Sequence, residues 1–315
     1  MLRFEQRTIL ETRTIGSLEV SVVGVGCNNF GARLDQDGTD AVVHASLDAG
    51  INFFDTADIY GATQSEVFLG NALGARRDEV IIASKFGMPI DDAHFGAKPT
   101  YVKSACEDSL RRLGTDHIDL YQLHYPDEST PIADTLGALA ELVKEGKVRE
   151  IGCSNLTAIQ LADAKLAAGD GPSFVSVQNQ YSLLAKDPER DGVLDACTKL
   201  DCGFLPFYPL ANGLLTGKIR PGTPLPKDTR LAAMSSERSA HWLSDEIQHR
   251  VSTLLYYAES IDVPILKLAF SWLLSRPQVS SVIAGASNPE QVRANAAAII
   301  DLNADVIARL DELTA

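Results

Sequence analysis

The chain has 315 residues, of which 45% are hydrophobic and 22% are charged, so it can form a sizeable core. Its 42 acidic and 28 basic residues give a net charge of −14, which argues against a general binder of nucleic acids or anionic membranes. The N-terminus lacks the apolar run of a signal peptide, and no segment approaches the roughly eighteen apolar residues of a membrane helix. We therefore expect a cytoplasmic protein that does not span a membrane.

The chain begins with a short hairpin and continues as alternating strands and helices. Arg13–Val20 alternates around Gly16 and Ser17, which predicts a β-hairpin that could plug one end of a barrel. Strands are predicted at Val22–Gly26, Asn52–Asp55, Val80–Lys85, Ile118–His124, Val148–Cys153, Phe174–Gln178, Gly203–Phe207 and Val279–Ala284. Eight strand-then-helix units without a linker favour an α/β fold, a closed (β/α)₈ TIM barrel with this hairpin and two extra helices.

The helices are delimited by glycines and capping residues, and the first is predicted to begin at a capping Thr39 or Gly38. We expect helices at Thr39–Ala49, Gln64–Leu73, Thr100–Leu113, Ile132–Glu145, Thr157–Ala168, near Asp191–Leu200, and at Asp245–Ile261, Pro264–Leu274, Pro289–Ile299 and Ala304–Leu313. One segment, Pro209–Leu243, has no clear period. A loop of this length is interpreted as a functional lid.

Ionisable side chains stand at the ends of three successive strands. Asp55 ends the second strand, Lys85 the third and His124 the fourth, and Tyr60 follows Asp55 by five residues. Taken singly, such residues usually cap a helix, face solvent or pack in a core. Because the carboxyl ends of parallel strands meet on one face, we expect these four side chains to form one site.

The four residue types suggest proton donation to a carbonyl oxygen. A tyrosine has an ordinary pKa of about 10, which a lysine cation within ~4–6 Å would lower. An aspartate paired with that lysine would fix its position and keep it charged. A histidine beside them can form a hydrogen bond with the substrate oxygen and orient it.

These residues lie in segments that resemble one enzyme family. Asp55–Gly61, with the sequence DTADIYG, resembles the D-T-A-x-x-Y-G signature of aldo-keto reductases. Similar segments follow in the family's order at Ala83–Lys85, Leu120–His124, Gly152–Asn155, Val177–Tyr181, Gly213–Lys218 and Ile283–Val292. The resemblance implies one barrel domain over residues 1–315 that binds a nicotinamide cofactor and interconverts carbonyls and alcohols, with Tyr60 as the acid. The alternative is a redox-sensing regulatory subunit, since some relatives are ancillary parts of ion channels.

The resemblance also implies the residues that bind the cofactor. They are Ser154, Asn155, Gln178, Phe207, Tyr208, Leu210, Lys218, Gly285, Ser287, Gln291 and Asn295. The first three match the positions that hold the nicotinamide carboxamide, although capping of strand ends explains their pattern equally well. Phe207 stands where the family usually has a tyrosine stacked on the nicotinamide, and it keeps the aromatic face without the hydroxyl.

The choice between NADP and NAD depends on the segment after the last strand. In the family this segment usually carries basic residues that bind the 2′-phosphate, but here none occurs before Arg293, and Glu290 adds a negative charge. Ser287 and Asn288 precede a predicted helix, whose N-terminus favours an anion. We therefore expect NADP(H) to be preferred by a modest margin, with NAD(H) usable.

Other ligand classes are not indicated. The five cysteines show no C-x-x-C spacing, so we interpret them as scattered reduced thiols, and no cluster has metal-ligand spacing. The expected partner is a small carbonyl or alcohol substrate, with no nucleic acid, membrane or metal. The sequence makes no prediction of the oligomeric state or of the particular substrate.

Overall fold

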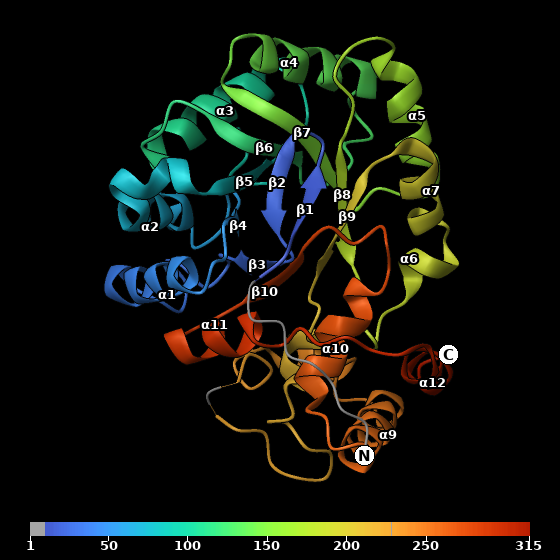
Figure 1. The fold of residues 1–315 in the computed structure, drawn as a ribbon. Coiled ribbons are helices and arrows are strands. Elements are labelled where there is room, and N and C mark those ends of the chain that lie inside the picture. The colour runs from blue at the N-terminus through green and yellow to red at the C-terminus, as the bar shows by residue number, and fades with distance from the viewer. Residues whose placement is uncertain (1–9, 228) are drawn as a thin grey trace.

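Eight parallel strands form the centre of the computed structural model, which describes residues 10–227 and 229–315 (Figure 1). In sheet order they are β10 (Val282–Gly285), β3 (Val23–Gly26), β4 (Phe53–Asp55), β5 (Ile81–Phe86), β6 (Ile118–Leu123), β7 (Val148–Ser154), β8 (Ser176–Gln180) and β9 (Gly203–Phe207). The barrel closes where Phe204 pairs with Val279 and its N–H donates to the carbonyl of Gln278 over 2.7 Å. The predicted (β/α)₈ barrel is therefore confirmed.

Helices surround this barrel and pack on its apolar outer face (Figure 1). They are α1 (Gln36–Asp48), α2 (Gln64–Leu73), α3 (Pro99–Leu113), α4 (Ile132–Lys144), α5 (Ala158–Ala168), α6 (Asp187–Arg190), α7 (Val193–Leu200), α8 (Ser236–Ala240), α9 (Asp245–Ser260), α10 (Ile265–Leu274), α11 (Pro289–Ala296) and α12 (Ala304–Leu313). Two short 3₁₀ helices, η1 (Gly74–Glu79) and η2 (Ala211–Thr216), complete the set in the described residues.

Two helix boundaries differ from the sequence prediction by three residues, and the other helix boundaries agree with it within two residues. Helix α1 begins at Gln36 rather than Thr39, because the side chain of Asp35 caps it by accepting from the N–H of Gly38 over 3.0 Å. Helix α11 ends at Ala296 rather than Ile299, with Ala297 as its cap. The long segment predicted without periodicity contains η2 and α8, which are too short to produce a detectable period.

The N-terminal hairpin packs against inward-facing residues of the barrel, as expected for a plug at one end. Its strands β1 (Thr12–Ile15) and β2 (Leu18–Ser21) pair antiparallel around the predicted turn. Ile15, Leu18 and Val20 of the hairpin are buried in a cluster separate from the main core. The barrel contributes Phe53, Ala83, Leu120, Leu205 and Ile283 to this second cluster. Five strands and the hairpin thus share one apolar layer.

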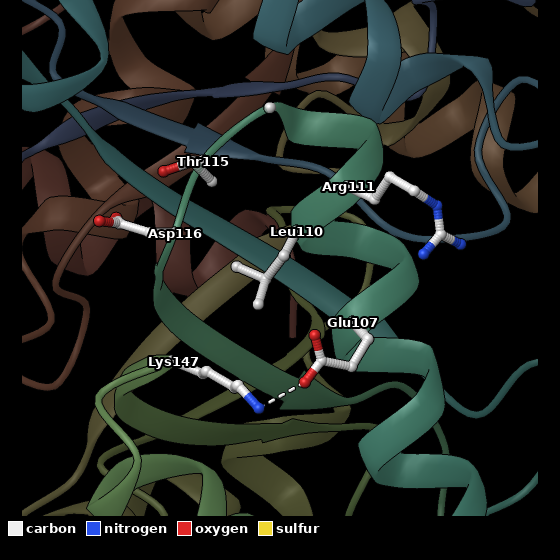
Figure 2. Close-up of a pocket in the computed structure, with 7 residues that line it drawn as sticks. Glu107, Leu110, Arg111, Thr115, Asp116 and Lys147 are labelled. Atoms are coloured by element: carbon white, nitrogen blue, oxygen red, sulfur yellow. Dashed lines mark ion pairs between the residues drawn. The ribbon is translucent and has the colours of Figure 1, made fainter.

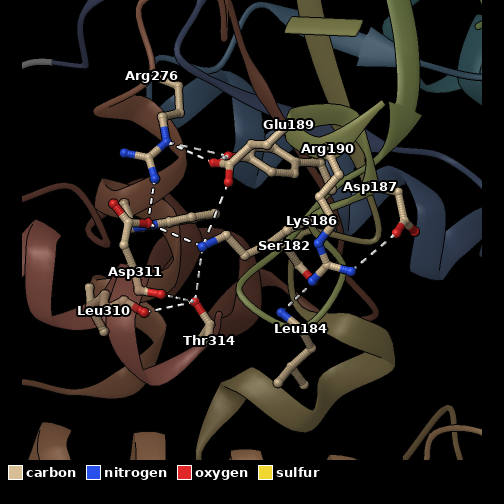
Figure 3. Close-up of polar contacts among 12 residues, drawn as sticks. Ser182, Leu184, Lys186, Asp187, Glu189, Arg190, Arg276, Leu310, Asp311 and Thr314 are labelled. Atoms are coloured by element: carbon tan, nitrogen blue, oxygen red, sulfur yellow. Dashed lines mark hydrogen bonds and ion pairs between the residues drawn. The ribbon is translucent and has the colours of Figure 1, made fainter. Parts of the chain in front are cut away.

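A group of polar contacts anchors the last helix to two neighbouring segments (Figure 3). Asp311 of α12 accepts from Nε1 of Trp272 over 2.9 Å and from Nη2 of Arg276 over 2.5 Å. Lys186 approaches the same carboxylate at 3.3 Å, and Arg276 also contacts Glu189 at 3.2 Å. One carboxylate therefore ties α12 to the end of α10 and to the segment that precedes α6.

The hairpin layer generates a prediction about stability. Leu18 is fully buried, so Leu18→Ala is expected to lower the free energy of unfolding by ~2–5 kcal/mol through lost burial and a residual cavity. The matched control is Leu166→Ala. Leu166 lies on the exposed face of α5, so this substitution is expected to change the free energy of unfolding little. Urea denaturation of both variants measures the difference. Equal midpoints for the two variants would contradict the plug.

Candidate functional site

The structure brings the four predicted catalytic side chains together at the carboxyl ends of the strands. Asp55 is the last residue of β4, Lys85 lies in β5, and His124 directly follows β6. Lys85 is fully buried, and its Nζ lies 2.7 Å from Oδ2 of Asp55 and 2.8 Å from the carbonyl oxygen of Thr56. The lysine therefore has one fixed position in this site.

Asp55 accepts hydrogen bonds from three side chains. Besides Lys85, it accepts through Oδ1 from Nε2 of Gln122 over 3.2 Å and from Nε2 of Gln178 over 2.9 Å. Burial alone would lower the pKa of Lys85, but the charge of Asp55 and the contact with Tyr60 outweigh it and raise that pKa. The lysine is therefore a cation at neutral pH.

Tyr60 stands on a loop that its neighbours hold close to Lys85. Nζ of Lys85 lies 5.1 Å from the centre of the Tyr60 ring, and its charge lowers the pKa of the Tyr60 hydroxyl. Gly61 follows at φ +58°, and a Cβ there would overlap the carbonyl oxygen of Phe30. Only glycine fits at this position, which explains why the sequence has it directly after the tyrosine.

The pKa of Tyr60 differs from the sequence-based expectation. Burial raises it above its ordinary value, and although Lys85 lowers it, the opposing effect of the lysine is smaller. The expected lysine contact is present, but the expected net decrease is not. The phenol therefore keeps its proton at neutral pH and is available as a donor.

His124 is a neutral imidazole in this environment. Burial and the nearby charge of Lys85 lower its pKa to about 3. Its ring centre lies 5.9 Å from that of Tyr60, and its Nδ1 is buried without a hydrogen-bond partner among the described residues. An imidazole that does not carry the extra proton can form a hydrogen bond with a carbonyl oxygen but is a poor acid. The geometry thus makes Tyr60 the better proton donor.

Three of the expected cofactor residues lie beside this group, at the ends of β7 and β8. Nδ2 of Asn155 donates to the carbonyl of His124 and to Oγ of Ser154, in both cases over 3.0 Å. Oγ of Ser154 donates to the carbonyl of Gln178 over 2.7 Å. Because the nitrogens of Asn155 and Gln178 are in use, their side-chain oxygens can accept from a ligand amide.

The end of β9 carries Phe207 and Tyr208 and an arginine that the sequence did not indicate. Tyr208 adopts φ +52°, an unusual conformation for a tyrosine, and its ring meets that of Phe207 edge-on at 5.2 Å. Nη2 of Arg230 donates to its hydroxyl over 3.2 Å, with Cζ 5.0 Å from the ring centre. Arg230 belongs to an aperiodic segment, so no sequence pattern could place it here.

The remaining expected residues lie in three places. Leu210 packs on the main core and precedes η2, and Lys218 is exposed just after η2. Gly285 ends β10, and Asn295 is buried in α11. Oε1 of Gln291 accepts from the backbone N–H of Ser287 over 2.9 Å and from its hydroxyl over 3.1 Å. The N-terminus of α11 is therefore already capped by its own side chains.

One buried acid in the loop of Tyr60 was not identified from the sequence. Asp58 is fully buried, and neither of its carboxylate oxygens has a hydrogen-bond partner in the described residues. Burial, reinforced by the charge of Glu66, raises its pKa to about 7. Its position two residues before Tyr60 was visible in the sequence, but an aspartate in a loop gives no signal of burial.

A surface pocket at the opposite end of the barrel is separate from this site (Figure 2). It is lined by Glu107, Leu110, Arg111, Gly114, Thr115, Asp116 and Lys147, residues of α3 and of the segments that precede β6 and β7. Lys147 and Glu107 form an ion pair across it.

Among the described residues, no group of three or more His, Cys, Asp or Glu side chains is arranged to hold a metal. No helix in the same residues is long and apolar enough to cross a bilayer.

Comparisons with known proteins agree with this geometry. The model of the aldo/keto reductase family matches residues 22–315. Probable voltage-gated potassium channel beta subunits of Arabidopsis thaliana and Oryza sativa subsp. japonica are each 32% identical, over 90% of this chain and 88% of theirs. Probable aldo-keto reductase 1 of Glycine max is 39% identical over 64% of this chain and 59% of its own.

A solved structure is also similar over almost the whole chain. The aldo-keto reductase AKR11C1 of Bacillus halodurans, in its holo form, superposes with a TM-score of 0.78 at 31% identity. The match covers 96% of each chain.

Asp58 generates a prediction about the pH dependence of stability. Its folded pKa is above its ordinary value of 3.8, so the folded state retains a proton that the unfolded state has lost, and stability falls as pH rises from about 4 to about 7. The side chain of the Asp58→Asn variant cannot ionise. Between pH 5 and pH 8 its free energy of unfolding is expected to fall by ~1–3 kcal/mol less than that of the unchanged protein. The control Asp163→Asn removes an exposed carboxylate on α5. Denaturant unfolding at both pH values measures this, and parallel losses in all three proteins would contradict it.

Proposed function

Because the chain belongs to the aldo/keto reductase family, we propose that it reduces aldehyde or ketone carbonyls to alcohols, or catalyses the reverse reaction, with a nicotinamide cofactor. The family and the fold support an oxidoreductase. The observation that carries the specific proposal is the position of Lys85, whose Nζ lies 2.7 Å from Asp55 and 5.1 Å from the centre of the Tyr60 ring. This arrangement places a protonated phenol and a fixed cation next to each other at the carboxyl ends of the strands.

The proposed roles follow from the protonation states. Tyr60 donates its proton to the substrate oxygen, and the cation of Lys85 stabilises the phenolate that remains. His124 forms a hydrogen bond with the same oxygen in its neutral form and so orients the carbonyl. Asp55 holds Lys85 in place and also fixes Gln178 through its other oxygen. A bound nicotinamide supplies or takes the hydride at the carbonyl carbon.

The polar groups beside the site fit a nicotinamide carboxamide. That group carries an N–H₂ donor and a carbonyl acceptor. We propose that the free side-chain oxygens of Gln178 and Asn155 accept from the N–H₂, with Ser154 completing the contact. Phe207 and Tyr208 supply an aromatic surface at the end of β9, and Arg230 adds a positive charge next to it. Leu210, Gly285 and Asn295 are proposed to shape the rest of the groove.

The cofactor is proposed to be NADP(H) by a modest margin, with NAD(H) usable. The N-terminus of α11 favours an anion, but the Ser287 N–H donates to Gln291 and the Gln291 N–H donates to Asn288, which leaves few free donors. Glu290 is exposed nearby. The exposed cations of Lys218 and Arg293 are the groups left to attract a 2′-phosphate.

A second candidate function is a redox-sensing ancillary subunit. It is favoured by the two plant relatives named as probable potassium channel beta subunits, which match nine-tenths of this chain. Such a protein would oxidise bound cofactor slowly in single turnovers, whereas an enzyme turns over generic aldehydes repeatedly. Steady-state assays of the pure protein against aldehydes, with a single-turnover trace of bound NADPH, separate the two functions.

The catalytic proposal is tested by removing the proton donor. Tyr60→Phe is expected to lower kcat for carbonyl reduction by at least ~10²–10⁴-fold, because general acid catalysis typically supplies that much, with the cofactor Kd changed only a few-fold. Lys85→Met acts through the same proton, so the double variant should lose less than the product of the two single losses. Tyr256→Phe, with an exposed ring on α9, is the matched control. A Tyr60→Phe protein with near-normal kcat would overturn the assignment.

The cofactor preference is tested by steady-state kinetics with both nucleotides. The ratio of kcat/KM for NADPH to that for NADH is expected to exceed one by a modest factor. Arg293→Ala should reduce this ratio several-fold, because it removes an exposed cation from α11. Arg111→Ala, on α3, is the control and should leave the ratio unchanged. A clear preference for NADH in the unchanged protein would show that the missing basic residues outweigh the helix N-terminus.

A further inference from the structure

Three of the five cysteines gather in one region of the structure, although their sequence spacing gave no such indication. Cys153 lies in β7, Cys197 in α7, and Cys202 directly precedes β9. All three are buried. Cys153 pairs with Val177 of β8, which in turn pairs with Phe204, two residues after Cys202. All five cysteines are free thiols, as the sequence predicted, but these three come from neighbouring parts of the barrel.

The turn after α7 brings Cys197 and Cys202 into contact. Asp201 adopts the left-handed conformation at φ 53° and ψ 50°, and its N–H donates to the carbonyl of Cys197. The N–H of Cys202 donates to the same carbonyl over 3.0 Å. This turn folds the chain back on the last helical turn and brings the side chain of Cys202 next to that of Cys197. Residues that close such a turn are near the separation that a disulfide requires.

The contact makes the two sulfurs chemically different. The neighbouring thiol of Cys197 lowers the pKa of the Cys202 thiol, and Lys165 acts in the same direction, whereas burial and Asp201 oppose it. The pKa of Cys197 is raised, chiefly by Cys202 and by burial. Cys202 is also the more exposed of the two, at 8% against 1% for Cys197. A thiolate is the nucleophilic form of cysteine, so its exposure and its lower pKa together make Cys202 the attacking sulfur and Cys197 the resolving one.

We propose that Cys197 and Cys202 form a reversible disulfide on reaction with a hydroperoxide, a modification site separate from the proposed oxidoreductase site. The Cys202 thiolate attacks the terminal oxygen of the hydroperoxide, the O–O bond breaks, and the alkoxide or hydroxide leaves as an alcohol or water after it takes up a proton. The resulting sulfenic acid is attacked by the sulfur of Cys197. The S–S bond forms, and the sulfenic oxygen leaves as water with the proton of Cys197. Two electrons pass from the thiols to the peroxide.

The test begins at equilibrium, because burial slows the entry of oxidant. The full-length protein is incubated in buffers that span ratios of reduced to oxidised glutathione, then blocked with N-ethylmaleimide under denaturing conditions and mapped by mass spectrometry. As the buffer becomes more oxidising, the number of blocked thiols is expected to fall from five to three, with a Cys197–Cys202 linked peptide that dithiothreitol removes. Hydrogen peroxide should give the same linked peptide.

Variants identify the pair and separate it from a structural effect. Cys197→Ser and Cys202→Ser should each abolish the two-thiol loss, while Cys106→Ser, a buried thiol on α3, should retain it. Circular dichroism checks that each variant is folded, and the measurement on the unchanged protein decides the proposal even where a variant is not. Five blocked thiols in every buffer, a Cys153–Cys202 link, or only mixed disulfides with glutathione would each overturn it. None of these readouts depends on carbonyl reduction.

Discussion

The buried ion pair between Asp55 and Lys85 is the interaction on which the rest of the site depends. Moving two charges out of water is unfavourable, and their attraction offsets this only when the remaining hydrogen-bonding groups are also satisfied. Here they are, because Lys85 also donates to Thr56 and Asp55 accepts from Gln122 and Gln178. The pair therefore holds the positive charge of Lys85 at one position. That charge lowers the pKa of both Tyr60 and His124. Its residues come from adjacent strands, so the barrel itself sets the distance.

Some residues of the site have a tightly constrained backbone, and others have a less constrained one. Strands supply Asp55 and Lys85, and the short loop with Gly61 supplies Tyr60, so their mutual geometry is determined by backbone pairing and close packing. Tyr208 and Arg230 come instead from a strained strand end and a long connection, where backbone conformation is less constrained by neighbours. The residues proposed to move the proton thus lie in the constrained part of the site, and Tyr208 and Arg230 lie in the less constrained part.

Much of the fold was predictable because strands and helices have strong periodic signals, and the candidate catalytic group because three of its four members stand at strand ends. The boundaries of α1 were not, since Asp35 caps the helix from a position that looks like loop. Arg230 and Asp58 were missed for a common reason: a residue in an aperiodic segment reveals neither what it contacts nor how deeply it is buried. The Cys197–Cys202 contact depends on one left-handed residue at Asp201, which the sequence does not encode in a recognisable motif.

The apolar layer inside the barrel has a consequence for the order in which the protein can fold during synthesis. Ile15, Leu18 and Val20 leave the ribosome early and can first pack on Phe53, Ala83 and Leu120, but their partners also include Leu205 of β9 and, near the end of translation, Ile283 of β10. Loop closure between such distant segments is slow, and the hairpin cannot complete its packing until the last strand is made. The growing chain therefore carries a hairpin whose apolar residues are only partly covered until β10 is synthesised.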